Sequence, residues 1–181
     1  MTSNRKSDKA ATHDDRDAHA AAKARIPPTT SRSVVHATFH LERLYDASRA
    51  RVWHALTDPA AKAHWFGAPA ENLTVLEREM DVRPGGRERL SGCWDSGVTS
   101  TFDALYYDVI ENERLVYCYE MHLHERKISV SLATLQLTAD GKRTRLALTE
   151  QGAFLDGYDD AGARERGTRE LLEALARALS R

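Results

Sequence analysis

The chain has 181 residues, of which 41% are hydrophobic and 29% are charged, and its formal net charge is −1. Such a chain buries enough apolar surface to fold as one globular domain without disulfides or metals, and its charge excludes binding of nucleic acid through a basic patch. No apolar run approaches the roughly 20 residues of a membrane span and no signal peptide is recognisable, so we expect no membrane association and a cytoplasmic location.

The first part of the chain, residues 1–33, has a composition of its own. All aromatic residues lie beyond it, starting with Phe39, and it carries seven Lys and Arg against four Asp and Glu. A segment without large apolar groups cannot join a core. We therefore predict a disordered tail and linker over residues 1–33 and one domain over residues 34–181.

The cysteine and histidine positions do not indicate a metal site. Cys93 and Cys118 stand alone in separate segments, which is typical of reduced, buried thiols. His122 and His124 share a strand face, as one other histidine pair does, but no carboxylate or cysteine stands at ligand spacing. We expect neither a metal nor a cofactor.

The domain begins with a predicted strand from Val34, where apolar and polar residues alternate through Leu41. Asp46 to Ser48 then offers a helix cap, and a short helix is predicted up to Thr57-Asp58-Pro59. A second short helix is predicted over Ala60 to Trp65. Gly67 and Pro69 follow it and favour its end there.

The next ninety residues predict an antiparallel meander. Turn signals such as Ala139-Asp-Gly141 separate six β-rich segments, namely Leu73 to Asp81, Gly86 to Trp94, Thr99 to Val109, Arg114 to Leu123, Lys127 to Thr138 and Arg143 to Glu150. Six consecutive strands without a helix exclude a doubly wound parallel sheet. After Asp159-Asp160, a stripe through Leu172, Leu175 and Leu179 predicts a C-terminal helix of about twenty residues.

Six phrases in this order resemble one family, the branch of the START-like (SRPBCC) superfamily named after the C-terminal domain of the activator of the ninety-kilodalton heat-shock protein ATPase. They are Tyr45-Asp-Ala-Ser-Arg-Ala-Arg-Val-Trp53, Leu56-Thr-Asp-Pro59, His64-Trp-Phe-Gly67, Asp81-Val-Arg-Pro-Gly-Gly86, Glu113-Arg-Leu-Val-Tyr117 and Thr144-Arg-Leu-Ala-Leu-Thr149. The resemblance implies an α+β helix-grip fold: a curved antiparallel sheet of about seven strands wraps the C-terminal helix and leaves a cavity between them. It implies no single activity.

One position departs from the family pattern. Members often carry Gly-Trp near the start of the last helix, whereas this chain has Gly167-Thr168. Thr168 lies on the stripe of Leu172 and Leu175, so the resemblance implies a larger and more polar cavity here. We also expect Gly167 to let the helix approach the sheet closely.

Alternation along the strands supplies the candidate cavity residues. Tyr117, Tyr119 and Met121 share a face in one strand, and Leu148 shares a face with Glu150 in the last strand. A carboxylate in an apolar cavity acts as an acid, a base or a ligand anchor, whereas at a wet end of the sheet it only meets water or an arginine. Further candidates lie on the helices or directly after them: Trp53, Trp65, Phe66, Thr168 and Leu172.

These residues support three functional hypotheses. The first is binding of a small apolar or amphipathic ligand in the cavity, without catalysis. The second is a cyclase- or hydratase-like enzyme that uses Glu150 with Tyr117 or Tyr119 as acid and base. The third is a protein-binding module resembling the chaperone activators. The sequence leaves a homodimer, a chaperone partner and the identity of the ligand open.

Overall fold

The structure, a computed structural model, describes residues 32–67 and 72–181. The tail predicted over residues 1–33 lies outside them except for Arg32 and Ser33, which both bond to Asp156. The elements follow one another as β1 (Val34–Tyr45), α2 (Arg49–Thr57), α3 (Pro59–Ala63), β2 (Leu73–Met80), β3 (Arg87–Trp94), β4 (Thr99–Ile110), β5 (Arg114–Leu123), β6 (Arg126–Asp140), β7 (Arg143–Leu155) and α4 (Ala161–Leu179).

The strands form one seven-stranded antiparallel sheet in the order β1-β7-β6-β5-β4-β3-β2. Each strand pairs with its neighbour in the chain, except that β1 crosses to pair with β7 and leaves β2 at the opposite edge. The β6–β7 hairpin turns at Gly141, whose φ of 62° suits a residue without Cβ. The prediction of an α+β helix-grip fold is confirmed.

Short polar side chains set the helix starts, as the sequence predicts. Ser48 accepts a hydrogen bond from the Arg51 amide at the start of α2, and Asp160 accepts one from the Ala163 amide at the start of α4. The second helix differs from its prediction, because α3 ends at Ala63 rather than at Trp65. The chain then turns through Gly67, which has a φ of 58°.

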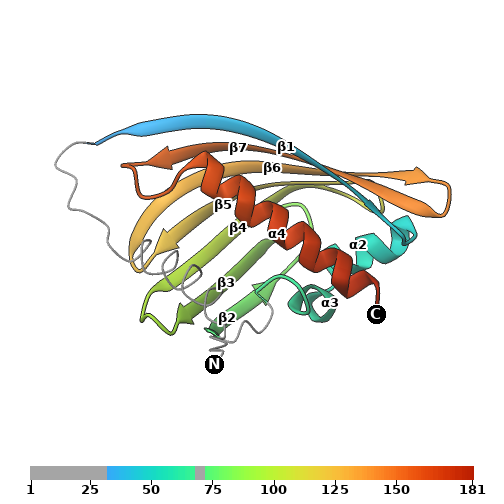
Figure 1. The fold of residues 1–181 in the computed structure, drawn as a ribbon, viewed down its shortest axis with the longest axis horizontal. Coiled ribbons are helices and arrows are strands. Elements are labelled where there is room, and N and C mark those ends of the chain that lie inside the picture. Colours follow the sequence, from blue (N-terminus) through green and yellow to red (C-terminus); the bar gives the residue numbers. More distant parts are fainter. Residues whose placement is uncertain (1–31, 68–71) are drawn as a thin grey trace, which may run out of the picture.

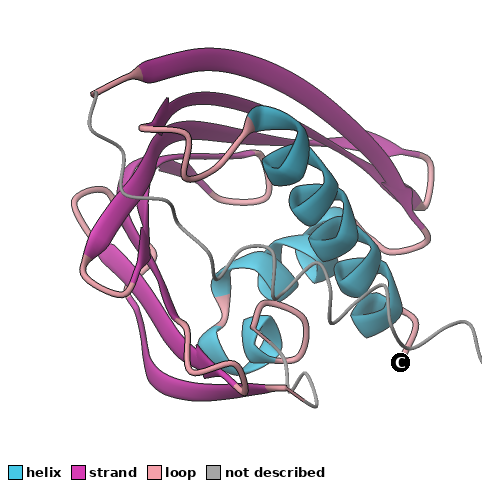
Figure 2. Ribbon diagram, turned by 60° about the vertical axis from the view of Figure 1, so that its left-hand side comes forward, coloured by secondary structure: helices cyan, strands magenta, loops and turns pink. Residues whose placement is uncertain are grey.

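Helix α4 lies across the concave face of the curved sheet (Figures 1 and 2). Its C-terminal half carries the core stripe, in which Leu172, Leu175 and Leu179 are buried together with apolar side chains from β1, β6 and β7. The hydroxyl of Tyr45 on β1 donates to the Leu172 carbonyl oxygen at 3.1 Å. This half of the helix is therefore held by apolar packing against the β1 side of the sheet.

The N-terminal half of α4 is less tightly packed. Apart from its chain neighbours and the backbone of its own helix, a Cβ atom added at Gly167 would meet no atom of the described residues within 4 Å. The expectation that Gly167 permits a close approach of helix and sheet is therefore wrong. The backbone at this point borders open space rather than a neighbouring strand.

The core stripe generates a stability prediction. We expect Leu175→Ala to lower the free energy of unfolding by about 2–5 kcal/mol, because the fully buried leucine leaves a cavity. The matched control is Leu44→Ala on β1, where the side chain is exposed and the change should stay within about 0.5 kcal/mol. Equal midpoints of urea unfolding for the two variants would show that α4 does not complete the core.

Candidate functional site

Aromatic side chains from β4 and β5 cover the middle of the concave face. Their rings are in contact: Tyr106 and Tyr117 have centroids 5.5 Å apart, and Tyr117 and Tyr119 have centroids 6.0 Å apart. Phe102 lies 5.0 Å from Tyr119 and 5.1 Å from Phe66, which follows α3. The alternation of β4 and β5 thus builds a continuous aromatic wall inside the curve of the sheet.

A buried polar cluster stands at the β7 end of this wall. The Tyr119 hydroxyl donates to Glu150 Oε1 at 2.5 Å and accepts from Arg164 Nη1 at 2.7 Å. Arg164 also lies 3.7 Å from Glu150 Oε1 and donates through Nη2 to Ser129 and Asp159. The cluster joins α4 to three strands through charge-assisted hydrogen bonds.

Glu150 is the most informative member of this cluster. Only 3% of the residue is exposed, so it does not lie at a wet end of the sheet. Burial raises the pKa of its carboxyl group, while the Tyr119 hydroxyl and the Arg164 charge oppose that effect. Because Asp159 also bonds to Arg164, two carboxylates share one guanidinium.

A second buried cluster lies at the β3 end of the wall. Lys62 of α3 donates to Glu88 Oε2 at 2.6 Å, and the Tyr106 hydroxyl donates to the same oxygen. Burial and the Glu88 charge raise the pKa of Tyr106, so its hydroxyl keeps its proton and acts as a donor. Lys62 thereby fixes α3 to β3.

Tyr117 lies between the two clusters and differs from its neighbours. Burial raises the pKa of its hydroxyl well above 10, with Tyr119, Glu88 and Glu150 adding to the effect. Yet the residue is only part-buried, and its hydroxyl makes no hydrogen bond to any residue of the described ranges. Solvent therefore reaches part of this residue on the inner face of the sheet.

We use the name cup for the region of the inner face around five part-exposed residues: Phe66, Phe102, Tyr117, Met121 and Thr168. Thr168 belongs here because it is one helical turn from Arg164, which reaches Tyr119, and one turn from buried Leu172. The structure thus brings four of the predicted residues, Phe66, Tyr117, Met121 and Thr168, to one region, with Tyr119 and Glu150 at its polar end.

Four predicted residues lie elsewhere or serve packing. Leu148, Leu172 and Trp65 are core residues, and the Trp65 indole donates to the Ala55 carbonyl at 2.8 Å. Trp53 lines a separate open groove of about 410 Å³ with Met80 and Val109.

Sequence reasoning missed Arg164, Lys62 and Glu88. The stripe of α4 extends by one turn from Thr168 to Arg164, and alternation places Glu88 on the inner face of β3, so both signals were available. Lys62 carried no comparable signal, because its partner lies on a strand that is distant in sequence.

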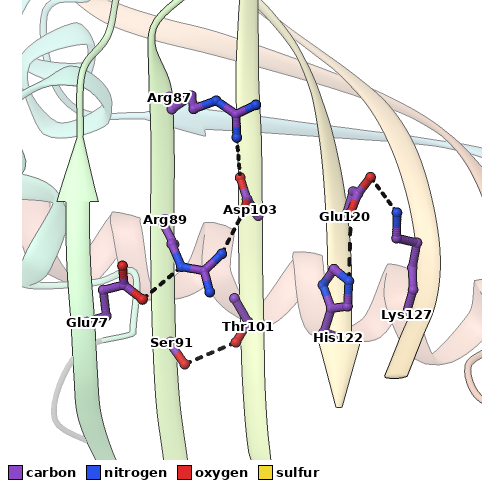
Figure 3. A network of polar contacts seen from close by, with 9 residues as sticks. All are labelled: Glu77, Arg87, Arg89, Ser91, Thr101, Asp103, Glu120, His122 and Lys127. Atoms are coloured by element: carbon purple, nitrogen blue, oxygen red, sulfur yellow. Dashed lines mark hydrogen bonds and ion pairs between the residues drawn. The ribbon is translucent and has the colours of Figure 1, made fainter. Parts of the chain in front are cut away.

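The convex face of the sheet carries exposed ion pairs (Figure 3). Arg89 pairs with Glu77 and Asp103, and His122 faces Glu120 on the same outer surface. Within residues 32–67 and 72–181, no group of three or more His, Cys, Asp and Glu is placed to hold a metal. In the same ranges no helix is long and apolar enough to cross a membrane.

A larger groove, of about 1120 Å³, lies at one end of the sheet. Its lining includes Arg32, His124, Arg126 and Tyr158, and it contains none of the candidate site residues. It is open and mostly polar, so it does not resemble the apolar cavity that the sequence predicts.

The buried state of Glu150 predicts a pH effect. Because the folded protein raises the pKa of this carboxyl above 4.5, it binds the proton more tightly than the unfolded chain, and the free energy of unfolding falls as pH rises through the folded pKa. Glu150→Gln removes this pH-dependent contribution to the free energy of unfolding. Its stability relative to the unmodified protein should therefore rise in urea unfolding as the pH is raised above about 4.5, the ordinary pKa of this carboxyl. Exposed Glu125→Gln is the control, and a pH-independent difference for Glu150→Gln would contradict the raised pKa.

Comparisons with known proteins place the chain in a family. No curated protein sequence matches it, but residues 46–180 match the family model described as activator of Hsp90 ATPase homolog 1-like protein. An uncharacterised protein from Rhizobium leguminosarum is 42% identical, with 83% of this chain and 99% of that chain covered and a TM-score of 0.79. A Rhizobium loti protein is also 42% identical, with 81% of this chain and 99% of that chain covered and a TM-score of 0.73. A protein from Chromobacterium violaceum is 25% identical, with 80% of this chain and 97% of that chain covered and a TM-score of 0.65. The chain therefore belongs to the activator of Hsp90 ATPase homolog 1-like family and has the START-like, SRPBCC fold of its structural neighbours.

Proposed function

We propose that this protein binds a small amphipathic molecule in the cup and does not transform it. The observation that carries the proposal is Tyr117, a part-exposed residue deep in the sheet whose hydroxyl has no partner among the described residues. A hydroxyl without a protein partner on a part-exposed residue is free to bond to a ligand as donor and as acceptor.

The walls of the cup suit the apolar part of such a ligand. Phe102 contacts Tyr117, and both Phe66 and Met121 are neighbours of Phe102. These residues supply apolar surface, and an aromatic ring adds edge-to-face contacts beyond simple burial. Ligand sites of this kind combine mostly apolar lining with a few polar groups that fix orientation. Here the Tyr117 hydroxyl and the Thr168 hydroxyl are those groups.

The second hypothesis, a cyclase- or hydratase-like enzyme, needs Glu150 and a tyrosine free to exchange protons with a substrate. Glu150 is buried, as that hypothesis requires. However, Glu150 and Tyr119 bond to each other, and Arg164 lies beside both. An acid and a base that saturate one another are poorly placed to act on a third molecule, so binding is the better supported function.

The third hypothesis, a module that binds a chaperone, needs an exposed apolar patch. The exposed large apolar residues of the described ranges are spread over four strands: Val34, Val35 and Leu44 on β1, Val75 and Leu76 on β2, Tyr107 and Ile110 on β4, and Val130 on β6. They do not form one surface. A chaperone partner, a homodimer and a cytoplasmic location stay predictions.

The departure at Thr168 offers a direct test of ligand binding. We expect Thr168→Trp to fold normally, because a ring can enter the open cup without the strain of an overfilled core. It should weaken binding of the uncharged fluorescent dye phenylnaphthylamine at least about tenfold, since the indole occupies the same space. The measurements are a thermal melting curve and a fluorescence titration.

The matched control is Arg166→Trp, which adds the same ring to the exposed face of α4 and should leave dye affinity unchanged. Unaltered dye affinity in a folded Thr168→Trp variant would show that the cup is not the binding site.

A further inference from the structure

We propose that the free edge of β1 is a dimer interface, in which the β1 strands of two copies of this chain pair antiparallel around a twofold axis. Strand β1 is the outermost strand of the sheet on the side of β7 (Figure 1). In the dimer the two seven-stranded sheets form one continuous sheet, with both α4 helices on the same face. This inference does not depend on ligand binding in the cup.

The two edge strands of the sheet differ in their protection against such pairing. Strand β2 has eight residues, a β-bulge between Val75 and Glu77, and the charged run from Glu77 to Glu79. Short length, bulges and charges are features by which natural edge strands avoid pairing with another chain. Strand β1 has twelve residues in an unbroken register with β7 and contains neither proline nor lysine. Of the two edges, β1 is therefore the one suited to accept a further strand.

The direction of the backbone groups along β1 follows from its pairing with β7. The Ser33 carbonyl oxygen accepts a hydrogen bond from the Asp156 amide at 2.9 Å, one step before the first pair of the ladder, Val34 with Leu155. Residues of an antiparallel strand direct their N–H and C=O groups alternately to the two sides of the strand. The odd-numbered residues of β1 therefore bond to β7. The even-numbered residues from Val34 to Leu44 direct theirs to the free edge, where no strand of residues 32–67 and 72–181 pairs with them.

One register of self-pairing matches the side chains at these even-numbered positions. A twofold axis at Phe39 places His36 of each copy opposite Glu42 of the other, a hydrogen-bond donor opposite an acceptor. The same axis places Val34 opposite Leu44, and these two residues are 52% and 40% exposed in the single chain. A register shifted by two residues instead places Val34 opposite Glu42 or His36 opposite Leu44. Only the register centred on Phe39 pairs apolar with apolar and polar with polar.

The twofold symmetry doubles each of these contacts. Val34 and Leu44 meet at both ends of the paired strands, so burial of their exposed surface stabilises the dimer at two places. Glu42 has an ion pair with exposed Arg145 at 3.4 Å, but 62% of its side chain is exposed and it has room for a second partner. The contacts of the single chain therefore leave this interface accessible.

Thr38→Pro tests the interface without removing a bond between β1 and β7. The Thr38 amide points to the free edge, and an edge strand tolerates proline where its amide has no partner within the sheet. We expect the full chain to sediment as a dimer at about 100 µM, a concentration at which an interface of micromolar affinity is mostly occupied. Thr38→Pro should raise the dissociation constant of the dimer at least about tenfold, because symmetry removes two backbone hydrogen bonds at once.

A charge exchange tests the register. His36→Glu should weaken the dimer because it places two carboxylates opposite each other, and addition of Glu42→Lys to that variant should restore the dimer. The matched control is Thr74→Glu, which adds the same charge at an exposed position of the other edge strand, β2, and should leave sedimentation unchanged. Should Thr38→Pro not fold, as judged by its circular dichroism spectrum, the charge exchange carries the test.

Three results would overturn the inference. The first is a full chain that stays monomeric at this concentration, as expected if residues 1–31 occupied the edge instead. The second is a dimer whose dissociation constant a folded Thr38→Pro variant does not change. The third is a His36→Glu variant that dimerises normally, or whose loss Glu42→Lys does not reverse.

Discussion

The bonds of Arg164 are the constraint on which the site depends. This one side chain of α4 reaches Tyr119 of β5 and Ser129 of β6, and lies beside Glu150 of β7, so it sets the position of the helix over the sheet. The C-terminal half of α4 is held differently, by buried leucines against the β1 side. A polar anchor therefore holds one half of the helix and apolar packing holds the other, and Gly167 lies between these two parts beside open space.

Two buried ionic clusters stand at the ends of the aromatic wall. Lys62 with Glu88 fixes α3 at one end of the aromatic wall, and Arg164 with Glu150 fixes α4 at the other. Buried ion pairs contribute little net stability compared with apolar packing, but removal of one partner leaves an uncompensated charge. Such pairs therefore favour one arrangement of the helix and strands that they join. Between them, the Tyr117 hydroxyl has bonding capacity that the described residues do not use.

Much of the fold follows from local patterns. Along β5 and β7, the alternation of apolar and polar residues predicts the inward-facing side chains correctly, because successive side chains of a strand point to opposite faces of the sheet. The helix caps at Ser48 and Asp160 also follow from local sequence, because each side chain bonds to an amide three residues further along the chain. The site is harder to predict, because the pairing of Lys62 with Glu88 depends on how distant segments meet. Gly167 shows the same limit: its sequence context resembles that of a close helix–sheet contact, yet the structure places it beside open space.

The central claim is that a small molecule binds against the Tyr117 hydroxyl, and nuclear magnetic resonance of the protein labelled with carbon-13 at the tyrosine ring ζ position tests it most directly. The chain has six tyrosines, and they report from different surfaces: Tyr117 borders the cup, whereas Tyr107 is exposed. On titration with phenylnaphthylamine, the account predicts a saturable shift of the Tyr117 signal, assigned with Tyr117→Phe, and an unchanged Tyr107 signal. Saturable dye binding that leaves the Tyr117 signal in place would contradict it.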